Sequence, residues 1–300
     1  MRAFLDSDLF YSFRRSKLAV ASFAVALICV LGAAFAPLLA PHDPTDLASL
    51  SLIDSLRPPA LTAEGSWEFP LGTDNQGRDM LSAIMYGGRI SLLVGVCAVL
   101  FAFLTGMTIG LAAGYTGGAV DAVLMRIADI QLTFPAILIA LLVDGIVAAA
   151  LPKALAQQLQ IPVLIFAIGI ANWPQFARTV RGSTLVERNK EYVMAAHVIG
   201  ISGPRIMLSH ILPNVLGPVL VIATLNLGFA ILAEATLSFL GVGLPPTQPS
   251  LGTLIRVGND FLMSGEWWMT IFPGIALVAL VGSINLLGDW LRDALNPRLR

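Results

Sequence analysis

The sequence predicts an all-α integral membrane protein with about six transmembrane helices. Hydrophobic residues make up 56% of the 300 residues and charged residues only 12%, whereas roughly a quarter of the residues of a soluble domain are charged. Several long stretches contain no Asp, Glu, Lys or Arg, and about 20 apolar helical residues cross a bilayer core of about 30 Å. The net charge of −1 argues against a nucleic-acid partner, since phosphate binding relies on clustered Lys and Arg. Membrane lipid is the expected surrounding.

Five of the expected spans lack charged residues, and a sixth carries them only near its start. The first follows a short basic segment, but it is longer than the apolar run of about 7–15 residues in a cleavable signal peptide, so an uncleaved helix is expected. Pro135, Pro174 and Pro273 are expected to kink their helices. The expected spans are residues 18–39, 90–120, 122–143, 161–177, 206–233 and 267–288.

The distribution of basic residues sets the expected orientation. With a cytoplasmic N-terminus, most of the 18 Lys and Arg residues fall on the cytoplasmic side, as positively charged loops tend to do. Both termini are therefore expected in the cytoplasm. Residues 1–17 are expected either to lie along the membrane surface or to form a plain tail. The chain then divides into a cytoplasmic segment 1–17, a first transmembrane helix 18–40, a periplasmic loop 41–88, a five-helix core 89–288 with a cytoplasmic loop 178–213, and a cytoplasmic tail 289–300.

The cytoplasmic loop 178–213 has the pattern helix, glycine, helix. Good helix formers fill residues 186–199, and Gly200 follows at the place where helices often end in a left-handed residue. Ser202 is a plausible N-cap of a second helix that runs towards Leu212. The small side chains of Ala195 and Ala196 leave a shallow face for another protein, although many loops merely connect their neighbours.

The same loop carries a resemblance to a known family. The residues Glu191-Tyr192-Val193-Met194-Ala195-Ala196, then Gly200, then Ile211-Leu212-Pro213-Asn214 resemble the EAA loop of permease subunits of ATP-binding-cassette (ABC) importers. In that family the loop forms a coupling helix that sits in a groove of the ATPase subunit. The resemblance therefore implies that Glu191, Tyr192, Ala195, Ala196, Gly200, Ile211, Leu212 and Pro213 couple this chain to an ATPase.

Further stretches resemble one branch of that family, the C-type permeases for dipeptides, oligopeptides and nickel. They extend the resemblance over nearly the whole chain from the first span onwards, and they imply the architecture of a type I ABC importer permease. They are residues 70–79 and 86–92, residues 114–118 with Asp121, Arg126 and Asp129, residues 234–243, and residues 285–293.

The resemblance also implies a division of labour. Such permeases lie in the bacterial inner membrane, pair with a homologous second permease subunit, bind two ABC ATPase subunits inside, and receive substrate from an extracytoplasmic binding protein. Peptides are the expected substrates, with nickel chelates, opines and glutathione-like compounds as alternatives. ATP and Mg²⁺ are expected on the partner subunits, because the phosphate-binding pattern GxxxxGK[ST] does not occur in this chain.

A few polar residues in or near the spans are candidate functional residues. Asp121, Arg126 and Asp129 are expected to anchor the third span at the inner interface, with Arg126 and Asp129 as an i, i+3 pair. Glu234 is expected either to line the translocation pathway or to pair with the outer loop or a neighbouring subunit. Asn226 and Asn285 are expected to hydrogen-bond between helices, with Asn226 in or beside the pathway.

Two other functional classes remain as alternatives. A self-sufficient secondary carrier needs coupling-ion residues near the bilayer midplane, where the spans hold almost no carboxylates. An enzyme has no support, because GxSxG is absent and the three histidines have no metal-ligand spacing. No catalytic, cofactor-binding or metal-ligating residues are expected.

Overall fold

The computed structural model describes residues 8–44, 46, 51–245 and 248–295. Their regular structure is helical, apart from an isolated antiparallel bridge between Thr73 and Asp79, which confirms the predicted all-α class. The parts of the predicted segments 1–17, 41–88 and 289–300 that fall on other positions lie outside the described residues. The α-helices are α2 Asp8–Arg15, α3 Lys17–Ala34, α4 Ala36–Leu39, α5 Met80–Thr116, α6 Gly118–Leu132, α7 Ala136–Ala150, α8 Lys153–Gln158, α9 Gln160–Glu187, α10 Glu191–Val198, α11 Gly203–Ile206, α12 Leu212–Phe239, α13 Leu251–Phe261 and α14 Trp268–Leu295, with 3-10 turns at Leu52–Asp54 and Leu262–Ser264 and a π turn at Met207–Ile211.

The described residues contain five helices long and apolar enough to cross a membrane, or six if the bent pair α6 and α7 counts as one span. That pair corrects the expectation of a single span over 122–143, because α6 and α7 meet at an angle of 91°. Pro135 lies at the bend, as the N-cap of α7. A proline disfavours helical geometry in the residue before it, which is Phe134 here. In contrast, Pro174 and Pro273 lie inside the uninterrupted helices α9 and α14.

Three helices extend past the limits expected from hydropathy. Helix α5 begins at Met80, so the loop that was expected to reach residue 88 ends at Asp79, whose carboxylate caps the helix by accepting from Ser82 N at 2.8 Å. Helix α9 continues through the expected loop start at 178 to Glu187, and α14 continues into the expected tail as far as Leu295. Charged residues end an apolar window, but they do not end a helix.

The helices α5 and α9 form the most extensive contact in the bundle. Gly106, Gly110 and Gly114 lie on one face of α5, four residues apart, and α9 packs directly on them: a Cβ at Gly110 would lie 2.5 Å from the carbonyl oxygen of Ala177. Small residues at such spacing let two membrane helices approach closely. This pair therefore forms the scaffold on which the other helices are arranged.

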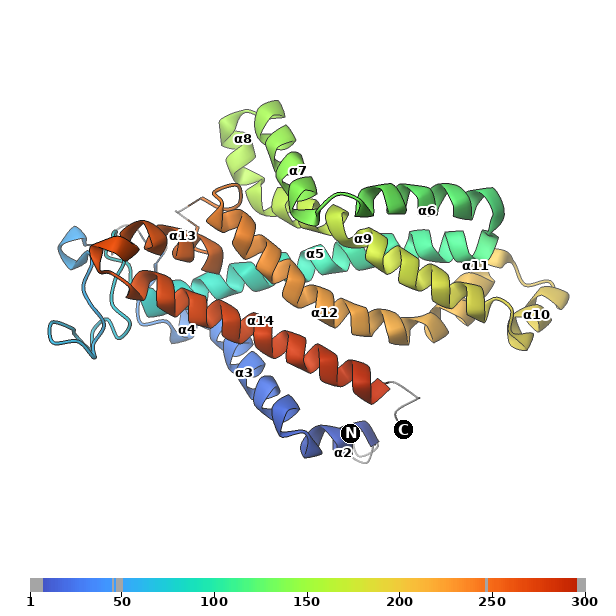
Figure 1. Ribbon diagram of the computed structural model, residues 1–300, viewed down its shortest axis with the longest axis horizontal. Coiled ribbons are helices and arrows are strands. Elements are labelled where there is room, and N and C mark those ends of the chain that lie inside the picture. The colour runs from blue at the N-terminus through green and yellow to red at the C-terminus, as the bar shows by residue number, and fades with distance from the viewer. Residues whose placement is uncertain (1–7, 45, 47–50, 246–247, 296–300) are drawn as a thin grey trace.

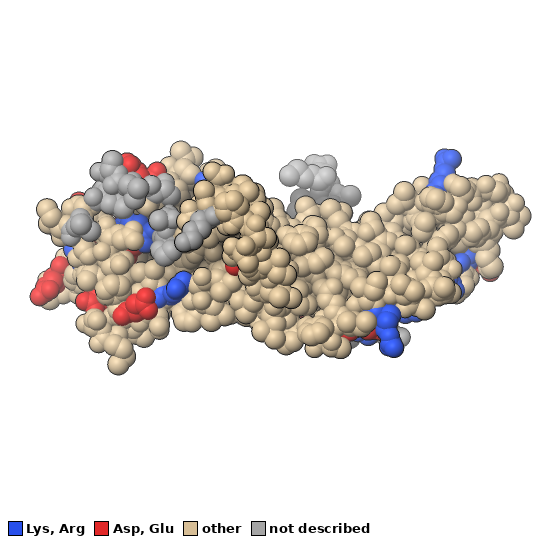
Figure 2. All heavy atoms as spheres, turned by 90° about the horizontal axis from the view of Figure 1, so that it is seen from above, with Lys and Arg blue, Asp and Glu red and all other residues tan. Residues whose placement is uncertain are grey.

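The molecule is elongated, and its polar residues gather towards its two ends. One end carries α10 and is called the α10 end; the other carries α13 and residues 51–79 and is called the α13 end (Figure 1). On the face that Figure 2 shows, Lys, Arg, Asp and Glu lie mostly towards these ends, and the middle of the molecule is almost free of charge. The first and last described helices lie together, with the rings of Phe13 and Trp290 5.1 Å apart. Helix α2 thus packs against the last turns of α14.

Residues 51–79 form an ordered segment of turns at the α13 end. Its prolines predict turns, and hydrogen bonds hold these turns together: Thr73 Oγ1 accepts from Arg57 N at 2.8 Å, and Trp268 Nε1 of α14 donates to Thr73 O at 3.0 Å. Arg78 and Asp74 form an ion pair with a distance of 2.6 Å and side-chain exposures of 3% and 2%. The segment is therefore anchored on the bundle by buried polar contacts.

Candidate functional site

The loop that resembles a coupling loop lies at the α10 end, between the long helices α9 and α12 (Figure 1). Helix α10 occupies Glu191–Val198, shorter than the expected 186–199, and Gly200 has φ +81°, the left-handed geometry expected of a glycine after a helix. Ser202 precedes α11 with extended backbone, and Pro204 lies in the first turn of α11. The sequence thus predicts the helix, glycine, helix order of this loop.

The two alanines of α10 face in different directions. Ala196 is 3% exposed and joins Val193 in the core cluster of the bundle, whereas Ala195 is exposed. The expected shallow face of two alanines therefore contains only Ala195. Glu191 is exposed as well. Helix α10 thus has one face fixed to the bundle and another that is free to meet a partner.

Large apolar side chains accompany Ala195 on the free surface of α10. Met194 is 52% exposed, Val198 is 87% exposed and Ile199, just after the helix, is 75% exposed. These side chains lie beyond the ends of the long apolar helices. Exposed apolar residues outside the membrane mark surfaces that other proteins cover.

The hydroxyl of Tyr192 joins the ends of the two neighbouring helices. It donates to Glu187 Oε2 at the end of α9 at 2.6 Å, and it accepts from Asn214 Nδ2 at the start of α12 at 3.2 Å. Partial burial, together with the carboxylate of Glu187, raises the pKa of Tyr192 to about 12, so the hydroxyl remains a neutral donor near pH 7. The Tyr192 hydroxyl therefore connects α10 to the end of α9 and to the start of α12.

Three residues form the start of the next span. Ile211 is fully buried in the core cluster, at the end of a π turn, Leu212 is half-buried, and Pro213 is exposed in the first turn of α12. A proline is tolerated there because the first N–H groups of a helix have no intrahelical acceptor. Ile211 thus fixes the loop to the bundle, and Pro213 lies at its surface.

Asp121 of α6 forms an ion pair with α9, whereas the expected pair of Arg126 with Asp129 does not form. Asp121 accepts from Arg181 in a two-point pair, with distances of 2.5 Å to Nε and 2.7 Å to Nη2. Arg126 and Asp129 are exposed and do not pair with each other. A bidentate contact with a guanidinium is stronger than a single helical i, i+3 pair.

Two further contacts, which sequence reasoning missed, fix the loop to α5. Arg188 donates to Gly114 O at 2.9 Å, and the rings of Tyr115 and His197 stack with centroids 6.0 Å apart. These residues lie more than 70 positions apart in the sequence, so no local pattern connects them. The loop is thus attached to α5, α9 and α12 together.

Glu234 lies in a closed polar cluster near the α13 end. Its side chain is fully buried; Oε2 accepts from Ser91 Oγ of α5 at 2.6 Å, and Oε1 accepts from Ser238 Oγ at 2.8 Å. Leu251 N, at the start of α13, donates to Ser91 Oγ at 3.4 Å. In this conformation the carboxylate therefore contacts protein on both oxygens, and its role in the pathway stays a prediction.

Asn226 is buried in the middle of α12. Its Nδ2 donates to Ile222 O of the same helix at 3.0 Å, so the hydrogen bond that it makes lies within one helix and not between two. The other expected partner, Asn285, packs against Gly228 of α12. The sequence thus predicts the polar character of this position but not its contact.

The Glu234 cluster leads to a stability prediction. Replacing Glu234 with alanine leaves the hydroxyls of Ser91 and Ser238 buried without their acceptor, at a cost of about 1–3 kcal/mol for each group. We expect E234A to lower the melting temperature of the purified protein, and E234Q, whose amide oxygen still accepts a hydrogen bond, to lower it less.

The matched control is E64A, which removes an exposed carboxylate from the same end of the molecule. If E234A abolishes transport but leaves the melting temperature unchanged, the packing role of Glu234 is wrong and a role in the pathway is favoured.

Two family comparisons match this chain. Residues 106–300 match the family described as binding-protein-dependent transport system inner membrane component. Residues 7–59 match the N-terminal transmembrane domain of oligopeptide transport permease C. The two matches together cover the first span and the core from residue 106 onwards.

Curated relatives match over nearly the full chain. The dipeptide transport system permease protein DppC of Haemophilus influenzae is 37% identical over 293 residues, which are 98% of this chain and 95% of the relative. The oligopeptide transport system permease protein OppC of Bacillus subtilis is 36% identical over 296 residues, 99% of this chain and 90% of the relative.

The fold resembles that of a solved importer. A chain of the MetNI methionine ABC transporter, in an inward-facing conformation, aligns with a TM-score of 0.56 at 20% identity, over 72% of this chain and 98% of that one. This likeness supports the arrangement of the helices and confirms the predicted importer permease architecture. From the extent of the family matches and the identity to its relatives, the chain belongs to the family of inner membrane components of binding-protein-dependent transport systems.

Proposed function

We propose that this chain is a permease subunit of an ABC importer that takes up di- or oligopeptides delivered by an extracytoplasmic binding protein. The surface of α10 carries the proposal: Val193 and Ala196 fix the helix to the bundle, and Ala195, Met194 and Val198 are left exposed. A short helix with an exposed apolar face is a common docking element, because a partner groove buries that face. The ATPase subunit is the partner proposed for it.

The names of the relatives support peptides as the substrate class. The two relatives compared above are named as dipeptide and oligopeptide permeases, and the agreement extends over almost the whole chain. Nickel chelates, opines and glutathione-like compounds are the alternative cargo for the same machinery. The binding protein selects the substrate, and this chain provides the passage.

The proposed complex contains this chain, a homologous second permease subunit, two ABC ATPase subunits and the binding protein. The ATPase subunits bind ATP and Mg²⁺, and this chain holds neither. We place the α10 end and both termini in the cytoplasm of the bacterial inner membrane, because Arg181, Arg188 and Lys190 lie beside α10 and basic loops tend to stay inside. Residues 51–79 then face the binding protein.

The experiment is purification of the chain from its native membrane in mild detergent, followed by reconstitution. We expect a second six-span subunit and ATPase subunits to co-purify, and uptake of a labelled dipeptide to require ATP and the binding protein. Uptake by the chain alone, driven by an ion gradient, would instead identify a secondary carrier.

A further inference from the structure

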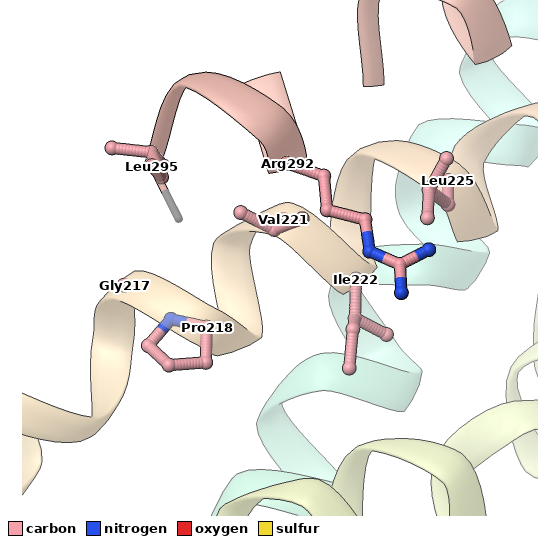
Figure 3. A pocket seen from close by; sticks show the side chains of 7 residues that line it. All are labelled: Gly217, Pro218, Val221, Ile222, Leu225, Arg292 and Leu295. Atoms are coloured by element: carbon pink, nitrogen blue, oxygen red, sulfur yellow. The ribbon is translucent and has the colours of Figure 1, made fainter. Parts of the chain in front are cut away.

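A cleft opens between α12 and α14 where the two helices diverge towards the α10 end. Its volume is about 560 Å³, within the range of roughly 300–1,000 Å³ that is common for small-molecule sites. One charged side chain, Arg292 of α14, enters a lining that is otherwise apolar (Figure 3). The lining residues are Gly217, Pro218, Val221, Ile222, Leu225, Arg292 and Leu295.

The guanidinium of Arg292 has no ion-pair partner among the described carboxylates. The residues Asp289 and Asp293 on the same helix are exposed and do not pair with it. Arg292 is itself exposed and lies in the segment expected as the cytoplasmic tail, so its guanidinium is accessible to solvent. The cation in this cleft is therefore available to an incoming anion.

The direction of the Arg292 side chain indicates that its guanidinium lies in the cleft and not in lipid. The described part of α14 ends only three residues later, at Leu295, yet the guanidinium lies beside Ile222 and Leu225, which are farther along α12 towards the middle of the bundle (Figure 3). A lipid-facing arginine extends towards the nearest aqueous surface. This side chain instead reaches across the cleft towards Ile222 and Leu225 of α12.

The chemistry of the cleft suits a peptide. A guanidinium binds a carboxylate through two parallel hydrogen bonds, and the apolar walls suit the side chains of short peptides. We propose that Arg292 binds the terminal carboxylate of a peptide in transit, in a cleft at the inner part of the pathway. This inference rests on the proposed function and adds a substrate-contacting residue to it.

A cysteine at Ile222 reports on occupancy of the cleft. The variant I222C is placed in a background of C29A and C97A, which removes both native cysteines, and the complex with its partner subunits is purified without nucleotide. A membrane-impermeant thiol reagent is expected to label I222C. We expect dialanine to protect I222C at a concentration about tenfold lower than its C-terminal amide does, because the amide lacks the carboxylate that the guanidinium binds through two hydrogen bonds; tenfold corresponds to about 1.4 kcal/mol.

The test of Arg292 itself uses two substitutions. R292Q should abolish the difference between dialanine and its amide, and R292K, which keeps the charge without the planar fork, should retain part of it. R14Q is the matched control, because it removes a basic residue outside the cleft on the same side of the molecule, and it should retain the full difference. If the complex with R292Q fails to assemble, R292K is compared with the complex that keeps Arg292. A smaller difference between dialanine and its amide in R292K then supports the role of Arg292, and an unchanged difference contradicts it.

Three results would overturn the inference. They are the absence of labelling of I222C, equal protection by dialanine and its amide, and protection by phosphatidylglycerol in place of dialanine, which would identify a lipid site. Uptake of dialanine by the unmodified complex is measured separately. If uptake occurs and the cleft test fails, only the inference about Arg292 is wrong; if no peptide is taken up, the proposed function itself is wrong.

Discussion

Substituting Ala195 with tryptophan is expected to reduce ATP-dependent uptake by more than about tenfold, since a clash at the centre of an interface costs roughly 2 kcal/mol or more. Ala195 is exposed on α10, so a larger side chain fits in the isolated chain without displacing its neighbours. The same side chain would fill the space where the proposed ATPase subunit packs. Uptake and recovery of the ATPase subunit with the tagged chain are the two measurements.

A substitution at the neighbouring residue, Ala196, distinguishes an effect on docking from an effect on folding. Ala196 is 3% exposed within the core cluster, so A196W overpacks the bundle and should lower the yield of folded protein. A195W should leave that yield unchanged. V186W, at a position of α9 that is 63% exposed, is the control for an added aromatic surface. Normal ATPase recovery and uptake with A195W would refute the docking role of α10.

The spans were predictable because a bilayer imposes one simple requirement. Each crossing needs about 20 apolar residues in a helix, and most of each expected stretch 90–120, 206–233 and 267–288 falls in one long helix, α5, α12 or α14. Helix limits were less predictable, because α9 continues through Arg178 and Arg181 as one helix. Hydropathy predicts which residues lie in lipid. It does not predict where a helix ends, because polar residues such as Arg178 and Arg181 can continue the same helix outside the lipid.

The angle between α6 and α7 could not be predicted from the local sequence. Pro135 predicts an interruption, but the angle of 91° depends on what the two halves pack against. Gln131 of α6 donates to Ile170 O and accepts from Trp173 Nε1 at 2.8 Å, both on α9. Contacts across about 40 positions therefore hold the first half of the span, and no single stretch of sequence contains them.

The sequence predicts where the candidate site lies along the chain, but not which of its residues contact the bundle. The motif from Glu191 to Pro213 predicts where the proposed coupling loop lies, and Gly200 predicts the end of its first helix. Which alanine faces the bundle was not predictable, because the expected helix 186–199 had no defined rotation about its axis. Arg292, expected in a charged tail, required the relative placement of α12 and α14 before its cleft was visible.

The second large effect is expected at the buried ion pair of residues 51–79. Removing one partner of a buried pair typically costs about 3–5 kcal/mol, because the other charge stays buried without compensation. The side chains of Arg78 and Asp74 are 3% and 2% exposed. We expect R78M to destabilise this segment by about that amount and to make it accessible to protease, with lower uptake because the segment is the proposed docking face for the binding protein.

Asp74 has a further task, so its replacement should cost at least as much. Its Oδ1 accepts from Gln76 N at 2.8 Å and from Arg78 N at 2.9 Å, and an alanine at this position loses both turn-forming contacts along with the ion pair. The double variant D74A/R78M should cost less than the sum of the single variants, because it leaves no unpaired charge. Hydrogen exchange of residues 51–79 measures all three.

A neighbouring pair in the same segment is the control. Arg57 and Asp54 also form an ion pair, with a distance of 2.5 Å, but their side chains are 39% and 26% exposed. Pairs that solvent screens contribute only about 0–1 kcal/mol, so R57M should change exchange and uptake little. If R57M and R78M change hydrogen exchange and uptake equally, burial is not what makes the Asp74–Arg78 pair important. If the destabilisation by D74A/R78M equals the sum of the two single variants, the two side chains act independently.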